Sequence, residues 1–201
     1  MSYVYKPYPI SEYINPGDEI LSWSSEKTNH LYQRFLETKT SRVIGLLWYL
    51  DLQNTPFGGR ELVAVASIKV RDLFLTPIPN EYATARESDV SIDHPSGPLK
   101  VASQGDVRLT SLGETIAIDL ALLLADSLVH STAYVWRLYK SGKKRDVHNN
   151  FPVISLDEDW KAVNPFVAGP NFARRTARGG ERAGNEWLYQ YDRLVKLASE
   201  L

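Results

Sequence analysis

One stretch of this chain constrains its fold more than any other, namely residues 116–129, which read IAIDLALLLADSLV. It is the most apolar run in the sequence, yet it contains Asp119 and Asp126 and is shorter than the roughly 20 residues of a membrane-spanning helix. Ser111 and Glu114 just before it form the capping-box pattern that starts a helix. We therefore expect a buried helix over residues 112–129, with Ile116, Leu120, Leu123 and Leu124 facing inward.

Two further segments carry apolar residues at helical spacing. Residues 24–39 begin with serines that can cap a helix, and their apolar face contains Leu31, Tyr32, Phe35 and Leu36. Residues 184–200 carry a second apolar stripe, made of Trp187, Tyr191, Leu194, Val195 and Ala198. We expect a helix in each segment.

Two pairs of apolar runs favour β-hairpins. Residues 42–52 are continuously apolar and residues 61–75 alternate, with the turn residues QNTPFGG between them, so these runs are expected to pair. A second hairpin is expected around SGKK, because β-branched and aromatic residues flank it on both sides. Its first strand has an alternative interpretation as a continuation of the preceding helix, since Leu128, Thr132, Val135 and Tyr139 also fit helical spacing.

Irregular structure is expected in three regions. Residues 1–10 read as an extended segment, residues 76–108 as a loop-rich insertion, and residues 164–182 as a basic loop. Together the elements predict a single α+β domain over residues 1–201, in which an antiparallel sheet of two hairpins packs against two or three helices. Their order is compatible with a ferredoxin-like (split βαβ) plan.

Composition excludes several classes of chemistry. The chain has no cysteine, so disulfides, thiolate metal sites and cysteine nucleophiles are excluded. No two of its four histidines lie three or four residues apart, and we expect neither a metal nor a cofactor. The N-terminus lacks the apolar stretch of a signal peptide, which together with the absence of cysteine favours a cytoplasmic protein. A net charge of -1 gives no overall attraction to a membrane, and no membrane partner is expected.

Charge is nevertheless uneven along the chain. Residues 137–182 contain ten basic and five acidic side chains, whereas residues 1–100 have a net charge of -2. The basic residues form two clusters, KSGKKR at the expected hairpin tip and RRTARGGER in the expected basic loop, and aromatic residues precede the first. The candidate binding residues are Lys140, Lys143, Lys144, Arg145, Arg174, Arg175, Arg178, Arg182, Tyr134, Trp136 and Tyr139.

These residue types suit a nucleic-acid surface. Lysine and arginine neutralise phosphates, and aromatic rings stack on unpaired bases, so RNA or single strands are the favoured ligands. The leading hypothesis is therefore a non-enzymatic binding protein whose basic region, residues 140–182, engages nucleic acid or a nucleoprotein complex. It requires that the two basic clusters come together as one patch open to water.

An alternative hypothesis is a protein–protein interaction or assembly component, including an inhibitor of a larger complex. Aromatic and arginine side chains dominate the energetics of protein interfaces, so the same arginines serve this interpretation. The tyrosine-rich N-terminal segment and the terminal helix, with Trp187 and Tyr191, are its expected docking elements.

The third hypothesis is a metal-dependent nuclease. Asp51, Glu61 and Lys69 fall on the first expected hairpin, where a magnesium site would need carboxylates and a lysine. Ser67 occupies the position at which such a site would need an acid, two residues before the lysine. No nucleophile elbow, P-loop or dinucleotide-binding glycine pattern is present, and no catalytic residue is assigned.

Overall fold

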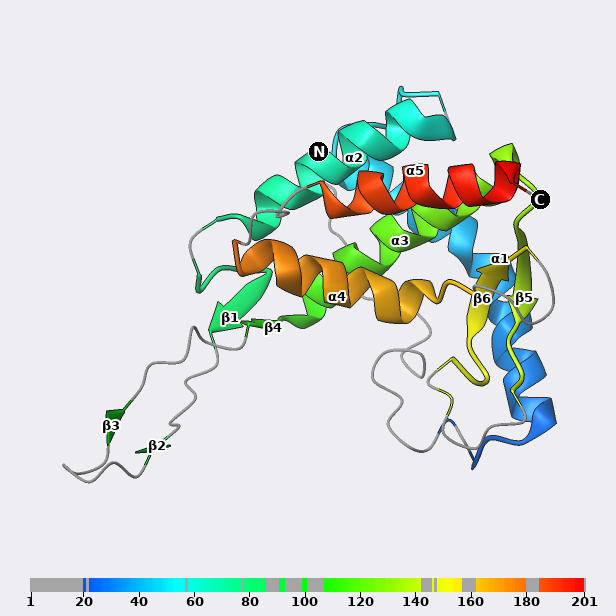
Figure 1. Cartoon of the computed structure of the whole chain (residues 1–201), viewed down its shortest axis with the longest axis horizontal. Helices are drawn as coiled ribbons and strands as arrows, with labels where there is room; N and C mark the ends of the chain where they lie inside the picture. Colours follow the sequence, from blue (N-terminus) through cyan, green and yellow to red (C-terminus); the bar gives the residue numbers. More distant parts are fainter. Residues whose placement is uncertain are drawn as a thin grey trace.

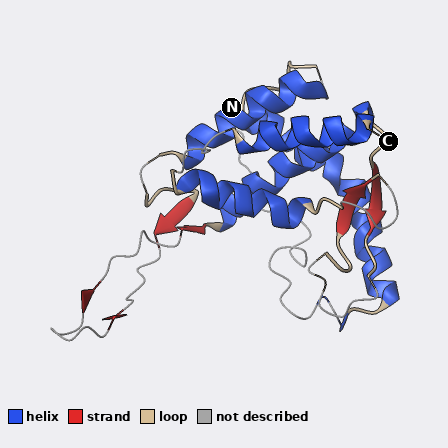
Figure 2. Ribbon diagram, viewed as in Figure 1, coloured by secondary structure: helices blue, strands red, loops and turns tan. Residues whose placement is uncertain are grey.

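The computed structural model describes residues 20, 22–56, 58–76, 78–85, 91–92, 99–100, 107–141, 146, 148–156, 162–179 and 185–200. Helices dominate this part of the chain (Figures 1 and 2). In chain order the elements are α1 (Ser25–Tyr49), α2 (Gly59–Phe74), β1 (Ala83–Ala85), β2 (Ser91–Ile92), β3 (Leu99–Lys100), β4 (Val107–Leu109), α3 (Ser111–Ser131), β5 (Val135–Leu138), β6 (Pro152–Ser155), α4 (Pro165–Ala177) and α5 (Glu186–Ser199). None of the described helices is both long and apolar enough to cross a membrane.

Helix α3 is the centre of the molecule, as the apolar run predicted. It is buried at nearly every position from Gly113 to Leu128, and α1, α2, α4 and α5 all contact it. Its cap is one residue earlier than expected, because the hydroxyl of Thr110 rather than Ser111 accepts a hydrogen bond from the Gly113 amide at 3.1 Å. A central helix that is buried on nearly all faces is the arrangement expected for a helix surrounded by others.

The α+β class is confirmed, with antiparallel strand pairs beside the helices. The described strands form three separate two-stranded pairs, β1 with β4, β2 with β3, and β5 with β6. The second expected hairpin is confirmed as β5–β6, and α3 ends at Ser131 instead of continuing into β5. The part of the chain that the structure describes contains no four-stranded sheet of the kind a ferredoxin-like plan requires.

The first expected hairpin is wrong, because its two strands are helical. The helix expected over residues 24–39 is confirmed, capped by Ser24, but it continues to Tyr49, and residues 59–74 form α2. The sequence resembled two strands because apolar side chains are exposed on the outer faces of both helices. Ile44 and Trp48 of α1 are 46% and 50% exposed, and Val65 and Ile68 of α2 are also exposed. These apolar residues interrupt the polar stripe that identifies a surface helix.

The expected basic loop is also wrong over most of its length, because residues 165–177 form α4. The side chain of Asn164 caps this helix by accepting from the Phe166 amide at 3.0 Å, and Pro165 occupies the first helical position, where proline is favoured. Gly169 allows α4 to lie directly on α3, since a Cβ there would come within 2.5 Å of the Ala117 carbonyl oxygen. Pro165 and Gly169 therefore serve helix initiation and close packing, respectively.

Two buried aspartates hold α3 against α1. Asp119 is fully buried and accepts from both Nε, at 3.2 Å, and Nη2 of Arg42. Oδ1 of Asp126 accepts from Lys39 Nζ at 2.6 Å and from the Trp136 indole nitrogen at 2.7 Å. Each buried carboxylate thus has a cation beside it, which is the condition under which buried charge is tolerated.

The remaining expectations concern the chain ends and the insertion. The terminal helix is confirmed as α5, with Trp187, Tyr191 and Leu194 buried. Within residues 76–108, β1 pairs with β4 so that Ala85 lies opposite Val107, and β2–β3 lies away from the helices (Figure 1). The extended segment expected at residues 1–10 lies outside the described residues.

Candidate functional site

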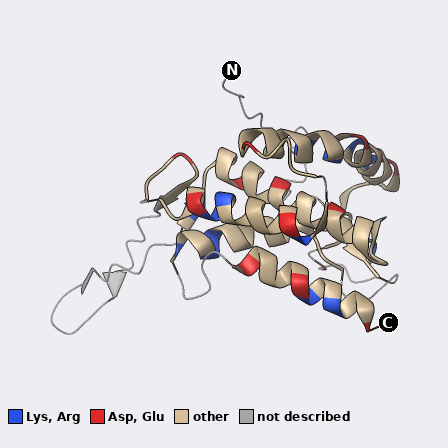
Figure 3. Cartoon of the chain, turned by 90° about the horizontal axis from the view of Figure 1, so that it is seen from above, with Lys and Arg blue, Asp and Glu red and all other residues tan. Residues whose placement is uncertain are grey.

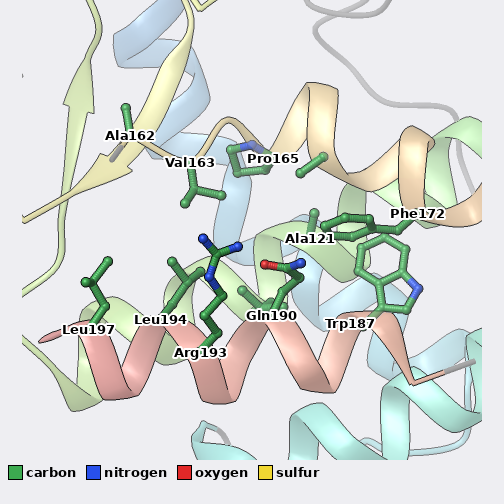
Figure 4. Close-up of a pocket in the computed structure, with 12 residues that line it drawn as sticks. Ala121, Ala162, Val163, Pro165, Phe172, Trp187, Gln190, Arg193, Leu194 and Leu197 are labelled. Atoms are coloured by element: carbon green, nitrogen blue, oxygen red, sulfur yellow. The ribbon is translucent and has the colours of Figure 1, made fainter. Parts of the chain in front are cut away.

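A cleft lies between α4 and α5, with α3 behind it (Figure 4). Its volume is about 200 Å³. The lining is mostly apolar and consists of Ala121, Leu124, Ala162, Val163, Pro165, Ala168, Phe172, Trp187, Gln190, Arg193, Leu194 and Leu197. Its residues come from α3, from the connection after β6, and from α4 and α5.

The walls of the cleft are fixed by packing against α3. Gly169 holds α4 close to the α3 backbone, as described above. On α5, Trp187 and Leu194 are buried, and the Trp187 ring meets Phe172 of α4 edge to face, with ring centroids 5.1 Å apart. This contact links α4 to α5 on the Trp187 side of the cleft, so that side of the cleft is formed by packed helices.

Two polar side chains project into the cleft from α5. The Arg193 guanidinium extends toward Val163 and Pro165, and the Gln190 amide lies beside it (Figure 4). Neither side chain has a hydrogen-bonding or ion-pair partner within the described ranges. The cleft therefore combines apolar walls with one cation and one amide.

The described acids on α5 and directly after it are engaged with other bases. On α5, Glu186 accepts from Arg175 at 2.7 Å and Asp192 accepts from Arg60 Nε at 2.7 Å. Glu200, which follows the helix, lies 3.9 Å from Lys196. None of the lining residues that the structure describes is acidic, so Arg193 has no counter-ion among them.

Electrostatics around the cleft favour an anion. The positive end of the α4 dipole points to the residues that precede it, and Val163 and Pro165 at that end line the cleft. The field of Arg193 also reaches the core. Burial raises the pKa of the Tyr134 hydroxyl, and the nearby charge of Arg193 partly opposes that rise.

The predicted arginine cluster lies mainly on α4 and is partly neutralised. Arg174 pairs with Glu114 of α3 at 3.3 Å, and Arg175 pairs with Glu186 of α5. Arg178 is exposed just after the helix, and Arg182 lies outside the described residues. Two of the four predicted arginines thus help to hold helices together.

The two predicted basic clusters do not meet where the structure describes them. Lys140 is exposed after β5, whereas Lys143, Lys144 and Arg145 lie outside the described residues. The C-terminal end of α4, which carries the arginines, lies at the opposite end of the molecule from β5 and β6 (Figure 1). Basic and acidic side chains are also interspersed along the helices (Figure 3). The single positive patch expected from the sequence is therefore not formed by Lys140, Arg174, Arg175 and Arg178.

The three predicted aromatic residues have structural roles. Tyr134 is 1% exposed, and Trp136 is partly buried, packing edge to face on Phe35 with its indole nitrogen bonded to Asp126. The Tyr139 hydroxyl donates to Asp146 at 3.1 Å. The backbone amide of His148 and, secondly, this hydroxyl lower the pKa of the Asp146 carboxyl against the opposing effect of burial. The docking residues of the alternative hypothesis, Trp187 and Tyr191, are buried as well.

The geometry assumed for a nuclease site is not present. Asp51 follows α1, while Glu61 and Lys69 lie on α2, so the hairpin expected to bring them together does not form. Among the described residues no three histidine or acidic side chains are grouped so that they could hold a metal ion.

The sequence interpretation missed Arg193 and Gln190 as site residues. Their helix and its apolar stripe were predicted, but the cleft depends on α4, which was expected to be a loop. The signal that could have revealed α4 is Asn164 followed by Pro165, a cap and a first-turn proline. With two helices at the C-terminal end, a polar residue beside each apolar stripe becomes a candidate for the groove between them.

The sequence matches no protein-family model and no curated protein, and the structure matches no solved structure.

Proposed function

We propose that this protein is a non-enzymatic protein–protein interaction component, and that the cleft between α4 and α5 receives an apolar side chain of its partner. The observation that supports the proposal is an apolar cleft whose two polar groups have no partner among the described residues. Clefts of this kind receive the anchor residues that dominate interface energetics.

The size of the cleft distinguishes between classes of occupant. Its volume of about 200 Å³ lies below the roughly 300–1,000 Å³ of sites that enclose drug-sized ligands. One large apolar side chain fits a space of this size, and burying such a side chain contributes about 1.5–3 kcal/mol. An anchor side chain on a partner protein is therefore favoured over a cofactor-sized molecule.

The nucleic-acid hypothesis has less support than this proposal. Two of its arginines pair with carboxylates, and its described members lie at opposite ends of the molecule. It remains a prediction with a direct test, a shift assay with single-stranded RNA at low and high salt. Binding that weakens steeply with salt and with the joint change of Arg174, Arg175 and Arg178 to alanine would favour it over the cleft.

The proposal is tested by filling the cleft. Short linear peptides are selected from a display library against the immobilised full chain, and synthetic copies are then titrated by calorimetry. Ala168→Leu places a larger side chain in the cleft wall. It should weaken binding about tenfold or more, because the space for the anchor is lost. Ala133→Leu makes the same change at an exposed position outside the cleft and should leave binding unaltered.

Two results would reject the proposal. The first is that the selected peptides bind the Ala168→Leu variant as tightly as the unchanged protein, which would place their binding site outside the cleft. The other is a selection that yields no binder at all. Circular dichroism melts of both variants establish that a loss of binding is not a loss of folding.

A further inference from the structure

We infer that the partner segment carries a carboxylate beside its apolar anchor, and that Arg193 recognises this carboxylate and determines specificity. The inference rests on the proposed function, and it adds the chemistry of the partner, an acidic peptide. Three features of the cleft lead to it: the position of the cation, the pairing of the described acids on and after α5, and the donor groups at the rim.

The position of Arg193 makes it a recognition group. Its guanidinium extends from α5 toward Val163 and Pro165, over the space that an anchor side chain would occupy (Figure 4). A guanidinium presents a planar fork of donors that matches a carboxylate with two parallel hydrogen bonds. An anchor that enters between α4 and α5 therefore brings its neighbouring residue within reach of this fork.

The pairing of acids leaves Arg193 without a counter-ion on its own helix. Glu186 and Asp192 of α5 already bind Arg175 and Arg60, and Glu200 lies beside Lys196. An occupant that covered Arg193 without offering an acceptor would remove hydrating water from the guanidinium without supplying a hydrogen bond in its place, at a cost in binding free energy. A neutral partner is thus penalised, and an acidic partner is preferred.

The other polar features of the rim act in the same direction. The Gln190 amide lies beside the guanidinium and offers donors to a carboxylate oxygen (Figure 4). The first residues of α4 add the positive end of a helix dipole at Val163 and Pro165. Cation, amide and dipole converge on one edge of the cleft, while the remainder is apolar.

The test uses two peptides that differ only in charge, the acetylated and amidated tetrapeptides Gly-Phe-Asp-Gly and Gly-Phe-Asn-Gly. Binding to the full chain at low salt is followed by nitrogen–proton correlation spectra, in which the side-chain amide of Gln190 reports on the cleft. We expect the acidic peptide to bind about three- to tenfold tighter than the neutral one. This preference should disappear in Arg193→Gln.

Lys196→Gln is the matched control, because it removes one positive charge from the same helix outside the cleft. It should retain the preference for the acidic peptide. Equal binding of the two peptides to the unchanged protein, or a preference that survives Arg193→Gln, would overturn the inference and leave the proposed function intact. Failure of both peptides to move the Gln190 signal would reject the proposed function, and the inference with it.

Discussion

The two sides of α3 are buried by different means. Toward α1, the helix presents Asp119 and Asp126, each paired with a cation and largely removed from water. Toward α4 and α5, it presents small and apolar residues, including Ala121 and Leu124, and the neighbouring helices leave a cleft there. One central helix thus has a charged, satisfied side and an apolar, incompletely filled side.

The difference separates a surface that holds the fold from one that is open to a partner. Buried ion pairs define the register of two helices strongly, because removing one member leaves an uncompensated charge. Apolar contacts tolerate small shifts, and a cleft among them retains space for an added side chain. A partner's side chain is therefore more easily accommodated on the α4–α5 side of α3 than on the α1 side. Three substitutions test this difference between the two sides.

The largest effect is expected from Asp119→Ala on the charged side. The change leaves Arg42 facing a buried site without its carboxylate, and we expect a loss of about 3–5 kcal/mol in the free energy of unfolding. Urea denaturation followed by tryptophan fluorescence measures it. Asp192→Ala is the control, because it breaks an exposed pair with Arg60 and should have a small effect. Similar losses in the two variants would contradict the division of α3 into two kinds of surface.

An intermediate effect is expected from Gly169→Ala on the apolar side. In an unobstructed helix this change stabilises by roughly 0.5–1 kcal/mol, because alanine has the higher helix propensity. Here the new methyl group meets the Ala117 carbonyl oxygen, so we expect destabilisation of about 1–3 kcal/mol. The sign of the change in the urea midpoint shows whether the clash with Ala117 outweighs the gain in helix propensity. A stabilised variant would mean that α4 is not held against the α3 backbone.

The smallest effect is expected from Arg193→Gln. If Arg193 serves binding rather than folding, its loss should change the free energy of unfolding by no more than about 0.5 kcal/mol, like other exposed substitutions. The same urea titration provides the value. A loss above about 1 kcal/mol would show that the guanidinium stabilises the fold and would remove it as a free recognition group.

The sequence predicted elements whose local signals agree with their environment. Helix α3 has an uninterrupted apolar run and a cap within one residue of the expected position, and α5 has one clear apolar stripe. The β5–β6 hairpin has β-branched and aromatic residues on both sides of a turn. In each case propensity, pattern and tertiary packing favour the same structure.

The elements that were wrong are those in which tertiary structure overrides local pattern. Trp48 on α1 and Ile68 on α2 are apolar residues on exposed faces, so they interrupt the polar stripe of a surface helix and make these segments resemble a pair of strands. In α4, Gly169 is required by a neighbour that is 52 positions earlier in the chain, at Ala117. The cleft depends on α4, so its site residues could not be predicted while that segment was expected to be a loop.

The pairing of β1 with β4 has a consequence for variation of this chain. Ala85 lies opposite Val107, so the backbone that leaves the helical body at one strand returns beside its point of departure. The entropy of closing such a connection rises by only about 0.6 kcal/mol for each doubling of its length. A connection of another length, or an inserted reporter domain, joined at Ala85 and Val107 is therefore expected to leave the helical architecture in place.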